Sequence, residues 1–391
     1  MSLRRIVTAV FLLSAVAGTA VAQVTPAAGY TPPDDTPSIR VGITLFPLYT
    51  YQTTPEATDA DGNTINRSSF DVARAYINIT GQISHLISFR ITPDITRESA
   101  LLSLPAGATV SNDSLVYRIK YAYAQFNLDD WMTKGSWARI GIQQTPWVDF
   151  DEGIYRYRFQ GTTFAERLPL LTTMTSADAG ASFHYNLPSN YGDFHVGLYN
   201  GENYQRVELN NDKAFEFRGT VRPFATQKPV LRGIRAHLVY YNDAYVGSDV
   251  RERVMGNVTF EHPYINGEFD YLKAKDKTLA TTPEVDSQGW AFWATPRKPF
   301  ANGASLEALI RYDHFIPNTA STAAPAATSP APGVTLLTQQ EQNRWIYGVA
   351  YWFPHQGGVT TAIMLDYDGQ VFNNIITAPV HAVTLHGLIN F

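Results

Sequence analysis

The chain has 391 residues and a formal net charge of −5, with 35 acidic residues against 30 Lys and Arg. The absence of cysteine excludes disulfides, thiolate metal sites and a cysteine nucleophile, and a mildly acidic chain without a basic block argues against nucleic-acid binding. Aromatic residues reach 13% at a mean hydropathy of −0.17, which suits either a membrane β-barrel or a large soluble β-sandwich.

The first residues have the order of a secretory signal. Arg4 and Arg5 form a basic segment, an apolar segment follows from Ile6 to Ala17, and Ala20-Val21-Ala22 is an A-x-A cleavage site. The apolar run is shorter than the ~20 residues that a membrane-spanning helix needs, which argues against an anchor. The predicted domains are a signal peptide over 1–22, an N-terminal periplasmic extension over 23–37 and an outer-membrane β-barrel over 38–391.

Beyond this segment, the dominant pattern is period-two alternation of apolar and polar residues in stretches of about ten residues. It is clear in Ile39–Leu45, in Ala73–Thr80 and in Val383–Phe391. In Leu115–Tyr123 the same pattern places Tyr121 on the apolar face, together with its neighbours two residues away. About sixteen such stretches fit into the chain, and this number of strands is enough to form a large barrel.

The connections between these stretches alternate in length. Gly81-Gln82 and Pro263–Gly267 are short, whereas Tyr51–Ser69, Pro93–Asp113 and Pro146–Thr175 are long. Outer-membrane barrels have short periplasmic turns and long outer loops, and a soluble sandwich has no reason to sort its loops in this way. We therefore predict an all-β fold, a single transmembrane antiparallel β-barrel of about 16 strands.

The third long connection differs from the others in composition. Pro146–Thr175 contains Trp147, Phe150, Tyr155 and Tyr157, among other large apolar residues. This is too much apolar surface to remain in water. We expect the third loop to fold into the barrel and to narrow it.

Several motifs resemble the phosphate-selective porin (O and P) family. They are Phe70–Gly81, Ile119–Tyr123, Ile140–Pro146, Thr163–Arg167, Asn200-Gly201, Glu307–Tyr312 and the terminal Phe391. The resemblance implies a sixteen-stranded barrel, a trimer, a third loop inside the pore and an anion-favouring lumen. The phosphate-specific members of that family have a lining rich in Arg and Lys, whereas this chain is acidic overall.

Selectivity in a pore depends on the charges of its lumen and constriction. The predicted constriction residues are Arg156, Arg158, Arg167, Asp149 and Asp151. The predicted lumen residues are Arg74, Arg90, Arg118, Lys120, Arg139, Arg218, Arg222, Arg235 and Arg311. Guanidinium groups at these places concentrate anions and bind phosphate or carboxylate oxygens. The alternative is that they pair with carboxylates such as Glu307 and only hold the third loop.

Other kinds of site have weaker support in the sequence. Asp149, Asp151 and Glu152 are candidate cation ligands, because hard cations prefer carboxylate oxygens, but loop anchoring is favoured. No Gly-x-Ser-x-Gly, Walker or His-Glu-x-x-His motif occurs, so we predict no enzymatic activity, no catalytic residue, no cofactor and no metal. A barrel-type lipid hydrolase, a channel for one specific solute and a secreted soluble β-protein stay as alternatives.

These observations predict a porin of the Gram-negative outer membrane, exported by a cleaved signal, for passive diffusion of small hydrophilic solutes with a preference for phosphate-like anions. The predicted partners are outer-membrane lipid, these solutes, a second and third copy of the chain in a homotrimer, and the barrel-assembly machinery, which reads the terminal Phe391. No nucleic acid is expected.

Overall fold

The computed structural model describes residues 35–97, 114–167, 174–208, 210–226, 230–244, 249–277, 283–320, 341–355, 357–373 and 378–391. The predicted signal peptide and most of the predicted N-terminal extension lie outside these residues. Within them, no helix has the length and apolar character needed to cross a membrane.

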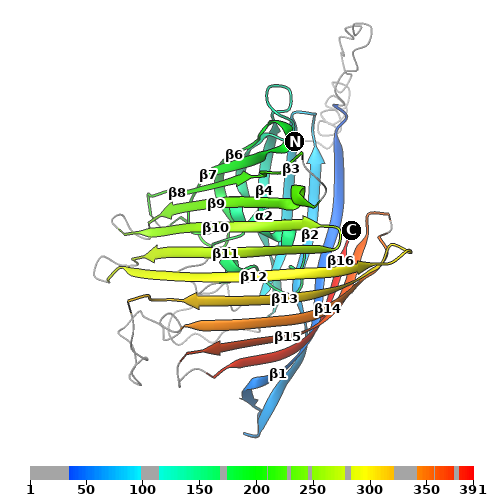
Figure 1. The fold of residues 1–391 in the computed structure, drawn as a ribbon, viewed down its shortest axis with the longest axis vertical. Coiled ribbons are helices and arrows are strands. Elements are labelled where there is room, and N and C mark those ends of the chain that lie inside the picture. The colour runs from blue at the N-terminus through cyan, green and yellow to red at the C-terminus, as the bar shows by residue number, and fades with distance from the viewer. Residues whose placement is uncertain are drawn as a thin grey trace, which may run out of the picture. The chain divides into compact units, whose positions relative to one another are not determined.

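Sixteen strands form one closed antiparallel barrel, in which each strand pairs with the next and β1 pairs with β16 (Figure 1). The strands are β1 (Ser38–Thr58), β2 (Thr64–Gln82), β3 (Ile87–Arg97), β4 (Leu115–Asn127), β5 (Trp137–Gln144), β6 (Ala177–Asn186), β7 (Gly192–Tyr199), β8 (Ala214–Val221), β9 (Ile234–Asp243), β10 (Arg251–His262), β11 (Ile265–Asp276), β12 (Val285–Pro299), β13 (Ser305–Ile316), β14 (Gln342–Trp352), β15 (Thr360–Phe372) and β16 (Val380–Asn390). The helices are α2 (Pro146–Tyr155), α3 (Phe164–Arg167) and the 3-10 turns η2 (Pro188–Asn190) and η3 (Leu231–Gly233). The predicted all-β fold is confirmed.

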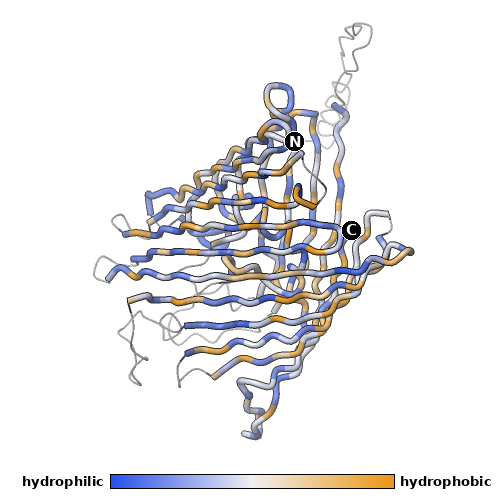
Figure 2. The backbone as a smooth tube through the Cα atoms, viewed as in Figure 1, coloured by the Kyte–Doolittle hydropathy of each residue, from blue (hydrophilic) through white to orange (hydrophobic). Residues whose placement is uncertain are grey.

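The strands bury polar residues inside the barrel and expose apolar residues outside it. In β10, Arg253, Asn257 and Thr259 are 0%, 3% and 0% exposed, whereas Val254 and Val258 are 40% and 50% exposed. The same alternation of hydrophilic and hydrophobic residues runs along most strands (Figure 2). This is the reverse of a soluble protein, in which apolar side chains turn inward.

The barrel closes between the first and last strands. The backbone N–H of Phe391 donates to the carbonyl oxygen of Ile43 at 3.1 Å, and the N–H of Ile43 donates to the carbonyl of Phe391 at 3.0 Å. The Thr44 hydroxyl donates to the Asn390 side chain at 2.6 Å. The last residue of the chain therefore completes the β1–β16 seam.

The first long connection is shorter than the sequence pattern predicted. Instead of a loop over Tyr51–Ser69, β1 and β2 continue as a paired ribbon, with Gln52 opposite Arg67 and Ala57 opposite Ile65, to a turn at Asp59–Asn63. Both faces of this ribbon are largely exposed, so neither requires apolar residues. A ribbon of this kind has no hydrophobic alternation, which explains why the prediction was wrong.

A β-bulge in β4 overturns a second expectation. Thr92 pairs with Tyr121 and Pro93 pairs with Ile119, so Lys120 is an extra residue in β4. An extra residue moves all following side chains to the opposite face. Tyr121 is consequently only 5% exposed and lies in the lumen, with the Arg90 guanidinium 4.5 Å from its ring centre. The apolar face predicted for Leu115–Tyr123 is wrong from Tyr121 onward.

Candidate pore constriction

The third loop begins with a short helix inside the barrel. Thr145 precedes α2 in an extended conformation and Pro146 occupies its first turn, where the missing N–H costs no hydrogen bond. Asp149 lies in the same turn, which suits the positive end of the helix dipole. The helix ends at Tyr155, and the residue that caps it, Arg156, has a left-handed backbone with φ of 61°. Because residues of the loop pack against wall residues on many strands, the loop lies inside the barrel, as predicted.

The start of α2 is fixed to the wall by polar contacts. The backbone N–H of Trp147 donates to the Glu216 carboxylate of β8 at 3.0 Å, and Arg218 Nε donates to the carbonyl of Pro146 at 2.9 Å. The Thr145 hydroxyl donates to the carbonyl of Thr175 at 2.5 Å and joins the two ends of the loop. These contacts place Glu216 and Arg218, the latter a predicted lumen residue, in the support of the loop.

Apolar packing holds the loop more extensively. One cluster joins loop residues such as Trp147 and Phe164 to wall residues such as Met255, Leu272 and Phe315. A second joins Tyr155, Tyr157 and Phe159 to the wall. Its wall residues are Phe46, Tyr76, Trp293, Leu309, Ile346, Ala350, Trp352, Ala362, Met364 and Leu388. In the described part of the chain, neither cluster includes a residue of β3, β4 or β5.

Arg311 of β13 anchors the middle of the loop. Its side chain is 1% exposed, forms an ion pair with Asp313 at 2.8 Å and donates to the carbonyl of Thr162 at 2.7 Å. It also donates to the Tyr155 hydroxyl at 3.3 Å, while Arg167 reaches Asp313 at 3.2 Å. Arg311 and Arg167 are thus engaged in holding the loop and are poor contacts for a passing solute.

The two remaining loop arginines differ. Arg158 forms ion pairs with Glu152 at 2.6 Å and with Glu166 at 3.0 Å. Burial by itself raises the pKa of Glu152, but Arg158 and Lys120 outweigh it, so the pKa lies below its ordinary value and the group stays ionised. Arg156 keeps 36% of its side chain exposed, lies 4.6 Å from the Trp352 ring centre and comes no closer than 3.9 Å to Glu307.

The inward cations of β2 to β5 form a separate group, which we call the basic wall. It consists of Arg74, Arg90, Arg118, Lys120 and Arg139. Arg74 and Arg118 share one carboxylate, Asp94, at 3.5 and 3.8 Å. Lys120 is 2% exposed, and its ammonium lies 5.2 Å from the Tyr76 ring centre and 5.3 Å from that of Tyr121. It is therefore part of the wall's interior.

Arg90 and Arg139 are the exceptional members of the basic wall. Arg90 donates to the side chains of Asn78 and Thr92, each at 2.9 Å. Arg139 donates to Gln125 at 2.8 Å and to Gln144 at 3.3 Å. All four acceptors are neutral. Among the described residues, neither guanidinium forms an ion pair with a carboxylate. Their positive charges are held in place but not neutralised.

The other predicted lumen residues lie toward the end of the barrel with the short turns. Arg218 pairs with Asp193 at 2.6 Å, and Arg235 pairs with Glu261. Arg222 follows the last residue of β8, in the turn, and donates to Asn190 at 2.7 Å. Arg222 therefore lies at the rim of the barrel.

The three acidic residues of α2 do not converge on one point. Glu152 pairs with Arg158, Asp151 is buried beside Glu268 and Asp270 of β11, and Asp149 is exposed in the lumen near Arg139 and Arg90. Within the described ranges, no group of His, Asp or Glu side chains has the arrangement of a metal site. The candidate cation site at Asp149, Asp151 and Glu152 is not formed.

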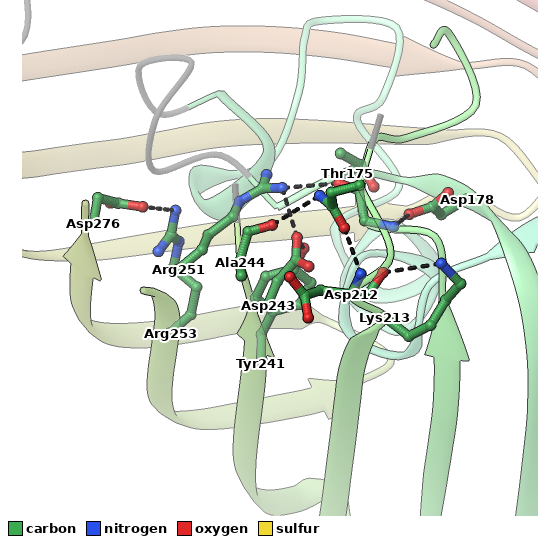
Figure 3. A network of polar contacts seen from close by, with 12 residues as sticks. Thr175, Asp178, Asp212, Lys213, Tyr241, Asp243, Ala244, Arg251, Arg253 and Asp276 are labelled. Atoms are coloured by element: carbon green, nitrogen blue, oxygen red, sulfur yellow. Dashed lines mark hydrogen bonds and ion pairs between the residues drawn. The ribbon is translucent and has the colours of Figure 1, made fainter. Parts of the chain in front are cut away.

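Sequence reasoning missed an arginine network at the end of the barrel with the long loops (Figure 3). Arg251 donates to the carbonyl of Gly201 at 2.8 Å and pairs with Asp243 at 3.1 Å, while Arg253 pairs with Asp276 at 2.7 Å. Both arginines lie on the inward face of β10, which its alternation with Val254 and Val258 could have revealed. Their partners lie on β9, on β11 and in the connection after β7, which no local pattern predicts.

Comparisons with known proteins support the fold. No protein-family model matches the sequence, and no curated protein matches it, so the resemblance to the phosphate-selective porin family stays a prediction. Among solved structures, the anion-selective porin from Comamonas acidovorans matches with a TM-score of 0.56 at 8% identity, covering 91% of this chain and 100% of that chain. The high-pH structure of Pseudomonas putida OprB matches with a TM-score of 0.52 at 9% identity, covering 90% and 94%. A loop L8 deletion mutant of OmpT from Vibrio cholerae matches with 0.51 at 11% identity, covering 90% and 100%. The chain therefore has the fold of bacterial porins.

Proposed function

We propose that this protein is a porin of the Gram-negative outer membrane that allows passive diffusion of small hydrophilic solutes and favours anions. The apolar outer wall suits lipid, since a barrel satisfies all backbone hydrogen bonds without water. The charged and polar inward faces suit a water-filled lumen. The predicted signal peptide and the fold shared with porins support the same location.

The position of the third loop supports a defined path for solutes. Its apolar contacts lie on β9 to β16, β1 and Tyr76, and none involves β3, β4 or β5 among the described residues. We infer that solutes pass between the loop and the basic wall. There they meet Arg90 and Arg139 on one side and Asp149 on the other.

The observation that carries the anion preference is that Arg90 and Arg139 form no ion pair with any carboxylate of the described residues. A charge that is already paired attracts a passing ion weakly, whereas an unneutralised charge in a confined lumen concentrates counter-ions. The structurally similar porin from Comamonas acidovorans is anion-selective, which agrees with this proposal. Specificity for phosphate has less support, because Lys120, Arg218 and Arg311 are buried or paired.

The proposal is tested by recording single channels of the purified protein in planar bilayers across a salt gradient. We expect ohmic channels with a reversal potential on the anion side. A reversal potential on the cation side contradicts the anion preference. Failure to form channels, together with lipid hydrolysis by the same sample, favours the alternative of a barrel-type hydrolase. Chemical cross-linking in detergent tests the homotrimer that the family resemblance implies.

A further inference from the structure

Three carboxyl groups meet where the third loop packs against the barrel wall. Asp151 lies on α2, and Glu268 and Asp270 lie on the inward face of β11. They are 1%, 5% and 2% exposed, and Asp151 and Asp270 are both within hydrogen-bonding reach of Glu268. Three ionised carboxylates at such distances repel one another, and burial removes the hydration that stabilises their charge. The cluster therefore requires a compensating ligand.

The neighbouring cation does not supply this compensation. Arg311 is the nearby positive group, but its guanidinium is engaged by Asp313, Thr162 and Tyr155. Asp313 is itself acidic and is shared with Arg167. The charged groups that face the cluster from β13 and from the loop are thus already paired with each other.

The neutral neighbours leave several oxygen atoms without a donor. The Trp293 indole N–H donates to Glu268 Oε2 at 3.1 Å, and the Asn257 amide donates to Asp270. Both carboxylate oxygens of Asp151, Oε1 of Glu268 and Oδ1 of Asn257 are buried and accept no hydrogen bond from any described residue. The Thr163 hydroxyl lies beside Asp151 and can turn toward it, but one hydroxyl cannot satisfy all of these oxygens. Since buried acceptors are normally satisfied, hydrogen-bond donors are missing here.

Protons supply such donors and also remove negative charge. A metal ion is the other ligand that compensates carboxylates, but within the described ranges no set of His, Asp or Glu residues is arranged to hold one. A protonated carboxyl turns one acceptor oxygen into a donor, which a neighbouring oxygen can accept. Shared protons therefore account for both the charge and the unsatisfied oxygens.

We propose that Asp151, Glu268 and Asp270 form a proton-operated latch that holds the third loop against the barrel wall. When protons are shared, α2 is hydrogen-bonded to β11. When they leave, the carboxylates repel and the loop detaches, which changes the pore. This regulation rests on the proposed function, because it acts through the loop that narrows the channel.

The direction of the pH dependence follows from proton linkage. Burial, and then the neighbouring Asp270, raises the pKa of Asp151 above its ordinary value. In a detached loop Asp151 is solvated and titrates near its ordinary pKa. The docked state thus binds protons more tightly, so docking is stabilised at low pH and loses this stabilisation as the pH rises through the raised pKa. Loop release is expected on the alkaline side.

The absence of cysteine in the chain allows a direct test of loop release. Ala165→Cys places a thiol at a position on α3 that is 0% exposed, and Gly153→Cys places one where a Cβ meets no atom within 4 Å. We expect the labelling rate of Ala165→Cys by a water-soluble maleimide, divided by that of Gly153→Cys, to rise by up to about tenfold per pH unit for each proton released. The ratio removes the effect of pH on the thiols themselves. A ratio that stays constant between about pH 6 and about pH 9 overturns the latch.

Channel recording separates failure of the latch from failure of the proposed function. We expect the unmodified protein to show a pH-dependent change in conductance and open-channel noise, which Asp151→Asn and Glu268→Gln abolish or shift. Asp61→Asn, in the exposed turn between β1 and β2, serves as the matched control and keeps the change. Steady channels whose conductance does not depend on pH overturn the latch but support a porin. A preparation that refolds to a heat-modifiable barrel but forms no channels overturns the proposed function, while the labelling ratio still tests the latch.

Discussion

The barrel wall has two regions that use arginine in opposite ways. On the loop-covered wall of β10 to β15, Arg253, Arg311 and Arg344 are paired with Asp276, Asp313 and Asp368, and large apolar residues pack beside them. On the basic wall of β2 to β5, Arg90 and Arg139 rest on aromatic rings and, among the described residues, donate hydrogen bonds to neutral acceptors only.

The contrast shows that an inward arginine is not by itself a selectivity residue. Burying a charge costs hydration energy that its partner offsets, so removing one partner of a buried pair is strongly destabilising and such pairs behave as structural supports. A guanidinium without a carboxylate keeps its field in the lumen. The two regions should therefore respond differently when their arginines are replaced.

The largest effect is expected for Arg311→Ala. This change leaves Asp313 buried without its main partner and releases Thr162, so we expect a loss of about 3–5 kcal/mol, as when one partner of a buried ion pair is removed. The temperature at which the barrel unfolds on a semi-native gel should fall, and channel noise should rise as the loop loosens. Arg90→Gln is the control from the basic wall. If it destabilises the barrel as much as Arg311→Ala does, the distinction between the two regions is wrong.

A smaller effect, on ion selectivity and not on stability, is expected when Arg90→Gln and Arg139→Gln are combined. The two changes remove unneutralised charges and leave polar side chains that can still bond their neutral partners. One unit charge attracts an anion at about 4 Å in water by about 1 kcal/mol, so the anion-to-cation permeability ratio should fall severalfold. The reversal potential in a salt gradient measures this ratio. Arg67→Gln, on the exposed ribbon of β1 and β2, removes one positive charge, as each of the two changes does, and should leave the ratio as it was, unless net charge alone decides selectivity.

The sequence predicted the parts of the fold that depend on local alternation. In β13, Glu307 and Arg311 face inward while Leu306 and Ile310 face outward, as the pattern indicates. The apolar residues of the third loop correctly predicted that it folds into the barrel, because such residues are stable only when they are covered.

The failures arise where the local pattern is interrupted or where partners are distant. Lys120 is an extra residue in β4 and turns the side chain of Tyr121 to the inward face. A pattern of alternating residues does not reveal such an insertion. Arg311 meets Thr162, and Asp151 meets Glu268, only because the loop returns into the lumen. Whether an arginine such as Arg139 lacks a carboxylate is decided by side chains on neighbouring strands and on α2. Sequence therefore predicted the inward face of strands with an uninterrupted pattern, but not which charges stay unneutralised.

The smallest effect is expected for Asp149→Asn, which should raise the anion-to-cation permeability ratio instead of lowering it. Asp149 is exposed on α2 across from Arg139 and Arg90, so its charge partly cancels their field without forming an ion pair with either guanidinium. Because mobile ions screen exposed charges, the anion-to-cation permeability ratio should rise by only about twofold at low salt and by less at high salt. Reversal potentials at two ionic strengths measure both parts of this prediction. A fall in the ratio, or a rise that does not diminish with salt, means that Asp149 acts by moving the loop and not through its charge. In that case solutes do not pass between α2 and the basic wall as proposed, even if Arg90 and Arg139 still determine the sign of selectivity.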